Sequence, residues 1–197
     1  MKKLFERLLV VMIVFTFCGR ALAELPSPIF PVGEVQERDL IVESLYRYKV
    51  YPYEPIQKIK YIDIEDSKYD TPEQTVFGHF SAMKSGDYDW FLETWTKESR
   101  IIMRESDKKR GRSKEFWVKT WDKVLSSREP YITSRIESGD YVFIVYSLKD
   151  SNGVVQFEDT LALELAGSFW KISQRLSSDP VGIYWSVPDK RVTQLAR

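Results

Sequence analysis

The chain has 197 residues, with 29 basic and 29 acidic side chains, and 43% of its residues are hydrophobic. This length suits one domain of ordinary size plus an extension, and the apolar share excludes a wholly disordered chain. The balanced charge gives no global reason to expect a nucleic acid as partner. One cysteine cannot form an internal disulfide, and one histidine supplies too few ligands for a histidine-based metal site. We therefore expect no metal and no cofactor.

The first 23 residues have the pattern of a secretory signal peptide. A basic start at Met1–Lys3 precedes the apolar run Leu8–Phe17, and Ala21-Leu22-Ala23 supplies the small residues of a cleavage site. The run is shorter than the roughly 20 apolar residues that span a bilayer. The bulky residue before Cys18 argues against a lipoprotein. We expect cleavage after Ala23 and an exported, periplasmic or secreted protein without a stable membrane span; an uncleaved anchor is the alternative.

Residues 24–66 are rich in proline and tyrosine. We interpret them as an extended arm that packs on the domain. The alternation of apolar and polar side chains around Ile59 and Tyr61 predicts one short strand in this arm. The domain itself is placed at residues 67–180, and residues 181–197 are interpreted as a C-terminal tail.

Three helices are predicted at the start of the domain. Thr71-Pro72-Glu73-Gln74 reads as a capping box with proline at the first helical position, and Gly86 ends this first helix. Asp87 can cap a second helix and Ser113 a third. A charged stretch lies between the second and the third helix.

After Pro130 the apolar period changes from 3.6 to 2, which predicts strands. Tight turns such as Asn152-Gly153 separate them, so consecutive strands should form an antiparallel meander. We therefore expect an α+β fold in which three N-terminal helices pack on a curved antiparallel sheet of four or more strands. The four predicted strands are Tyr131–Ile136, Tyr141–Lys149, Val154–Leu165 and Phe169–Ser177.

Three segments resemble the nuclear transport factor two-like superfamily, which includes ketosteroid-isomerase-like and polyketide-cyclase-like proteins. They are TPEQTVFGHFSAMKSGDYDWFLETW, the hairpin GDYVFIVYSL and the closing LALELAGSFWKISQ. The resemblance covers about residues 71–178. It implies a cone-shaped α+β pocket and a dimer formed through the sheet. It implies no single activity, because the superfamily includes enzymes, ligand carriers and structural subunits.

Three polar residues occupy positions that the pattern sends into the apolar interior: His79, Asp159 and Gln174. Strict alternation places Asp159 on the apolar face of its strand, where loss of hydration would raise its pKa. Asp159 and His79 are therefore the candidate acid–base residues of an enzyme. The alternatives are an Asp159 turned outward by a β-bulge or paired with an arginine, and a His79 that is a satisfied core residue.

Trp95, Trp117 and Trp121 recur at helical spacing and either fill the core or line a pocket for an apolar ligand. Together with the polar trio they make up the predicted ligand-binding residues. The basic segment 100–114 could hold phosphate groups of a lipid or a nucleic acid. Acidic residues interrupt it, so we interpret it as a solvated loop.

The aromatic content and the shortage of catalytic residues favour an exported, non-enzymatic domain that binds a small apolar or amphipathic ligand or a protein partner. A homodimer through the sheet and an envelope protein are the expected protein partners; no nucleic acid is expected. One alternative is a ketosteroid-isomerase-like or dehydratase-like enzyme that transfers a proton. Another is a structural subunit of an envelope assembly.

Overall fold

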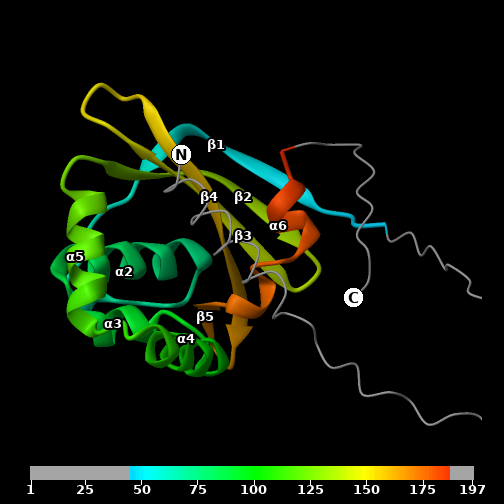
Figure 1. Ribbon diagram of the computed structural model, residues 1–197. Helices are drawn as coiled ribbons and strands as arrows, with labels where there is room; N and C mark the ends of the chain where they lie inside the picture. The colour runs from blue at the N-terminus through cyan, green and yellow to red at the C-terminus, as the bar shows by residue number, and fades with distance from the viewer. Residues whose placement is uncertain (1–44, 187–197) are drawn as a thin grey trace, which may run out of the picture. The chain divides into compact units, whose positions relative to one another are not determined.

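The computed structural model describes residues 45–186, and they form a five-stranded antiparallel sheet with helices on both faces (Figure 1). The strands pair in the order β1-β2-β3-β4-β5. They are β1 (Lys49–Lys58), β2 (Glu129–Ser138), β3 (Tyr141–Lys149), β4 (Val155–Ala166) and β5 (Phe169–Ile172). The helices are α2 (Pro72–Ser85), α3 (Tyr88–Glu93), α4 (Lys97–Arg110), α5 (Lys114–Leu125) and α6 (Pro180–Tyr184), with the short 3-10 helices η1 (Ile64–Asp66) and η2 (Gln174–Leu176). The predicted signal peptide lies outside the described residues, as does the predicted tail beyond residue 186.

The predicted fold class is wrong in the order and number of its elements. The helices do not precede the sheet, because strand β1 comes first and four helices, α2 to α5, connect it to β2. The sheet therefore starts inside the segment that the sequence presents as an arm.

Strand β1 escaped prediction because Pro52 and Pro55 interrupt its pattern. Proline cannot donate a backbone hydrogen bond and is confined to the edges of sheets. Here β1 is an edge strand that pairs antiparallel with β2, and its register shifts between Pro52 and Gln57. The short strand expected around Ile59 and Tyr61 is not formed; β1 ends at Lys58 and Ile59 is a buried core residue.

Two further segments differ from the sequence-based prediction. The charged stretch after Thr96 is the regular helix α4 rather than a loop. The last strand ends at Ile172, and the chain continues into η2, where Phe169–Ser177 was predicted to be one strand. The pairing of β5 is limited to Leu163–Ala166 of β4, so the first half of β4 is left as a free edge.

The central strand β3 is buried on both faces. Val142, Ile144 and Leu148 pack in the cluster beneath α2, while Phe143 and Val145 pack in the cluster beneath α6. Figure 1 shows α2 to α5 on one side of the sheet and α6 on the other. A Cβ atom on Gly182 of α6 would lie 2.9 Å from the Phe143 ring, so the glycine lets α6 approach the sheet closely. None of the described helices is long and apolar enough to cross a membrane.

Candidate functional site

His79 lies in the core between α2 and α3. The side chain is 5% exposed and is surrounded by the rings of Phe91 and Trp95, whose centroids lie 4.7 and 5.8 Å from the imidazole. Its Nδ1 atom is 3.0 Å from Thr94 Oγ1, and that hydroxyl donates its one hydrogen to the Phe91 carbonyl. Nδ1 must therefore carry the proton and donate it to Thr94. Burial lowers the pKa of His79 to about 3, so the ring is neutral at physiological pH.

The three predicted tryptophans pack against neighbouring rings. Trp121 is buried and its ring centroid lies 4.6 Å from that of Phe91. Trp117 donates from Nε1 to the buried Asp107 carboxylate at 2.9 Å. Trp95 is partly buried, and its Nε1 has no hydrogen-bond partner among the described residues. Most of this aromatic surface fills the space between helices instead of lining a pocket.

Asp159 and Gln174 do not form a site with His79 in the folded chain. Asp159 is exposed on β4, and its carboxylate accepts a 2.8 Å hydrogen bond from the Thr160 backbone N–H. The interior position predicted for Asp159 is wrong, because Val155–Asp159 is exposed on both faces of β4 and none of the described helices covers this part of the strand. Gln174 is part of η2, is half-buried and donates to Ser177 Oγ. The interior polar trio predicted from the sequence is therefore not assembled.

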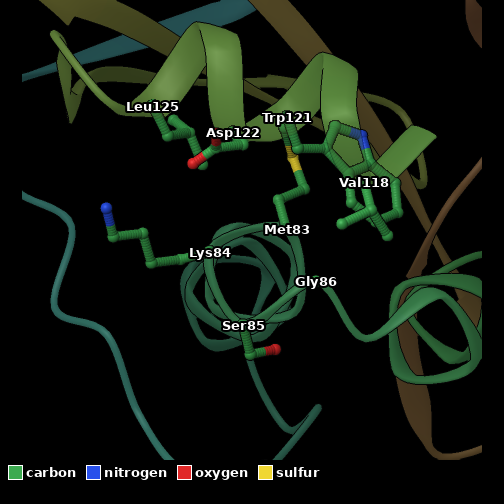
Figure 2. Close-up of a pocket in the computed structure, with 8 residues that line it drawn as sticks. All are labelled: Met83, Lys84, Ser85, Gly86, Val118, Trp121, Asp122 and Leu125. Carbon is green, nitrogen blue, oxygen red and sulfur yellow. The ribbon is translucent and has the colours of Figure 1, made fainter. Parts of the chain in front are cut away.

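Two cavities flank helix α2. The smaller, of about 160 Å³, lies between the C-terminal end of α2 and helix α5 (Figure 2). Figure 2 shows Met83 pointing toward α5 and Ser85 on the opposite side of α2. Trp121 lines this cavity, and the other five predicted ligand-binding residues line neither cavity. Binding pockets for small organic ligands usually enclose about 300–1,000 Å³, so the smaller cavity falls short of that range.

The larger cavity, of about 360 Å³, lies between α2 and the segment that links β1 to it. We call it the linker cavity. Its apolar wall comes from Ile62 and Phe77, and its polar groups come from Gln74 and from three charged residues. The six lining residues are Lys60, Ile62, Asp66, Lys68, Gln74 and Phe77.

The linker is held by contacts with the core, α2 and α3, which fix the cavity between it and α2. Ile59 anchors its start in the core, and the Ile62 backbone N–H donates to Ser81 Oγ at 2.9 Å. At the other end, Ser67 Oγ accepts a hydrogen bond from Trp90 Nε1 at 3.2 Å. Gly78 allows this approach, because a Cβ atom there would lie 2.9 Å from Ser67 Oγ.

One buried polar atom and two exposed lysines of the linker-cavity residues lack partners among the described residues. Gln74 Oε1 is buried and accepts no hydrogen bond from any described residue. The capping box predicted from the sequence is half formed: Thr71 Oγ1 accepts from the Gln74 backbone N–H, but the Gln74 side chain does not return the bond. Lys60 and Lys68 are exposed, and neither takes part in the ion pairs of residues 45–186. Sequence reasoning missed these residues because they are separated in the chain and carry no motif.

A second polar group that the sequence did not predict joins the start of α2 to the sheet. Glu73 accepts from Tyr53 Oη at 2.6 Å and from the Arg135 guanidinium at 3.1 Å. Arg135 also contacts Glu137 at 3.0 Å. Burial pushes the pKa of Glu73 up, but the Tyr53 hydroxyl and the Arg135 charge bring it below its usual value. These groups satisfy one another, so the cluster fastens α2 to β1 and β2.

Lys171 of β5 is held by an aromatic residue and a carbonyl group. Its Nζ lies 3.2 Å from the centroid of the Tyr69 ring and donates to the Glu93 carbonyl at 2.8 Å. Burial lowers the pKa of Lys171 to about 8, and the nearby Arg100 adds to this effect. This contact attaches β5 to the end of α3.

Comparisons with known proteins correct the family resemblance and assign no function. No family model and no curated protein matches the chain. A solved structure that it matches is a SEC-C motif containing protein from Rhodopseudomonas palustris, with 16% identity, 54% of this chain and 78% of that chain covered, and a TM-score of 0.40. The resemblance to the nuclear transport factor two-like superfamily is wrong, since nothing in these comparisons points to that superfamily.

Proposed function

We propose that this protein is a non-enzymatic binding domain that holds a small amphipathic organic anion in the linker cavity. The observation that carries the proposal is the set of unpartnered polar groups on an apolar wall. Gln74 Oε1 is buried without a donor, and Lys60 and Lys68 have no ion-pair partner among the described residues. A buried acceptor without a donor costs about 1–3 kcal/mol. Because Gln74 Oε1 is closed to solvent, the Gln74 side chain would have to turn into the cavity to accept a ligand N–H or O–H, and that bond would remove the cost.

The three kinds of group match three parts of a ligand. Phe77 and Ile62 would contact its apolar body, and Gln74 would accept a hydrogen bond from it. The two lysines outnumber the single acid, Asp66, at the rim and would attract a carboxylate or sulfonate. This combination of an apolar lining with a few placed polar groups is typical of ligand sites. The signal-peptide pattern of the first 23 residues supports an exported location for this activity.

A titration with 8-anilinonaphthalene-1-sulfonate, an aromatic sulfonate, tests the proposal. We expect its fluorescence to rise saturably with the native chain and the affinity to fall several-fold in the Lys60→Gln/Lys68→Gln variant. The matched control is Lys49→Gln/Lys119→Gln, which removes two exposed charges elsewhere. Near-ultraviolet circular dichroism on each variant checks that the fold is intact.

A tryptophan pair decides which cavity holds the probe. Gln74→Trp should fill the linker cavity and abolish saturable binding, whereas Asp122→Trp, at the rim of the smaller cavity, should leave it unchanged. Equal binding by the native chain and Gln74→Trp would contradict the proposal. Loss of binding in Asp122→Trp alone would move the site to the cavity beside Trp121.

A further inference from the structure

Helix α4 exposes two of its three apolar residues and buries polar ones; the third, Met103, packs against the core. Ile101 and Ile102 are 51% and 49% exposed, while the buried residues of the helix are Ser99 and Asp107. A surface helix normally turns its apolar residues toward the core. The buried polar groups and the exposed apolar pair therefore distinguish α4 from an ordinary surface helix.

Hydrogen bonds hold α4 in this orientation. Ser99 Oγ contacts Thr96 Oγ1 at 2.7 Å and accepts from the Gln174 backbone N–H at 2.8 Å. Asp107 Oδ2 accepts from Tyr88 Oη at 3.1 Å and from Trp117 Nε1 at 2.9 Å. Rotating the helix to bury the two isoleucines would break the bonds to Gln174, Tyr88 and Trp117. The exposure of Ile101 and Ile102 is thus imposed by the packing of the opposite side.

Charged side chains, more of them basic than acidic, surround the exposed isoleucines. The helix carries six basic and three acidic residues, and none of the six takes part in an ion pair within residues 45–186. By the helical spacing of three and four residues, Lys97, Arg104 and Lys108 lie on the side of Ile101, and Glu98 and Glu105 lie beside both isoleucines. We call this surface the α4 outer face. It carries three basic and two acidic residues, and its members are Lys97, Glu98, Ile101, Ile102, Arg104, Glu105 and Lys108.

We propose that the α4 outer face docks on the surface of an anionic lipid bilayer. Basic residues beside aliphatic ones are the pattern of helices that lie in the membrane interface, where the aliphatic side chains enter the acyl boundary and the cations contact phosphate groups. A single-stranded nucleic acid fits less well, because proteins hold its bases by stacking them on aromatic rings and the α4 outer face has no aromatic residue. The proposal is independent of the linker cavity and goes beyond ligand binding.

A probe placed on α4 reports docking at this face alone. We would label Ser106→Cys, an uncharged position one helical turn from Ile102, with an environment-sensitive dye in a Cys18→Ser background and use the full chain. The matched control carries the same dye at Ser151→Cys, an exposed position in the turn between β3 and β4. Vesicles of phosphatidylglycerol with phosphatidylcholine should shift the α4 emission to the blue and leave the control unchanged. Pure phosphatidylcholine vesicles should shift neither.

Variants of the patch then test its two components. Removing three cations with Lys97→Gln, Arg104→Gln and Lys108→Gln should weaken docking by about 100-fold, since each basic residue at such a surface contributes about fivefold. The Ile101→Ser/Ile102→Ser variant should remove the blue shift at saturating lipid. Lys49→Gln, Lys119→Gln and Lys123→Gln together are the matched control and should dock as the native chain does.

Three results would overturn the proposal. They are an α4 probe that does not respond to anionic vesicles, a response that survives removal of the three cations, and a response equal to that of the control position. A single-stranded oligonucleotide that changes the emission, where vesicles do not, would assign the face to nucleic acid instead. Far-ultraviolet circular dichroism on each variant separates loss of docking from loss of the helix.

Discussion

Helices α2 and α4 have the same length and the same caps but opposite burial. Each has 14 residues, a threonine N-cap that accepts a backbone hydrogen bond, and a C-cap glycine with positive φ. Eight residues of α2 are buried, whereas α4 buries two, both polar. The caps therefore decide where a helix begins and ends, and the side chains between them decide what it contacts. Helix α2 holds the core and one wall of the linker cavity, and α4 presents a surface.

Truncating one apolar residue in each helix should give the largest contrast. Phe80→Ala in α2 removes a core ring that is 3% exposed and should lower the free energy of unfolding by about 3–5 kcal/mol. Ile102→Ala in α4 should change it by less than about 0.5 kcal/mol, because the side chain is half in water already. Urea unfolding of both variants measures the two values. Similar losses would show that α4 is packed against more of the chain than its contacts indicate.

Removing the carboxylate that anchors α4 should have the next largest effect. Asp107→Ala leaves Tyr88 Oη and Trp117 Nε1 without their acceptor and should cost about 2–3 kcal/mol. An aspartate in the last turn of a helix is unfavourable to the helix dipole, so its bonds must account for its contribution. Urea unfolding against a Glu105→Ala control measures the loss. If both variants lost the same small amount, Asp107 would not anchor the helix.

The single histidine of the chain should make the protein sensitive to mild acid. The folded pKa of His79 is about 3 and lies below the unfolded value near 6.5, so the unfolded state binds the proton first. Stability is therefore complete above pH 6.5 and falls as the pH decreases, by about 2 kcal/mol at pH 5. His79→Phe should flatten the profile between pH 5 and 7, which chemical unfolding at several pH values would show. An unchanged slope in that variant would mean that other groups titrate in this range.

The smallest expected difference between the two helices concerns their N-caps. Thr71→Ala and Thr96→Ala each remove an N-cap oxygen and should each cost about 1 kcal/mol. The measurement is urea unfolding, with Thr71→Ser and Thr96→Ser as variants that keep the hydroxyl. A loss at Thr96 much above that at Thr71 would show that its contact with Ser99 Oγ contributes beyond the cap.

The same contrast explains what the sequence could predict. Helix α2 was predicted from Thr71 to Gly86 because its caps and its apolar stripe agree. Helix α4 was missed, although its caps are equally good. Its inward side is fixed by hydrogen bonds of Ser99 and Asp107, and Met103 between them is a single apolar residue that makes no period. Strand β1 was missed because of its prolines, and its pairing partner β2 lies about 80 residues further along the chain.

The candidate site was harder to predict than the fold. Helical spacing correctly places His79 against the core, but strand alternation cannot say that the helices leave the first part of β4, with Asp159, uncovered. The linker cavity depends on the path of residues 59–68 over α2, which is set by Ser81, Ser67 and Gly78. Such contacts between a loop and a helix have no period and no motif. The unpartnered Gln74 Oε1 becomes visible only when the hydrogen bonds of the folded chain are traced.

Native mass spectrometry of the full chain, purified without denaturation, tests the proposed binding function most directly. The mass of the native chain, set against its denatured mass, should show a retained small molecule. That extra mass should be absent from Gln74→Trp and present in Asp122→Trp. A native chain that carries no extra mass, or an extra mass that Gln74→Trp retains, would contradict a ligand in the linker cavity.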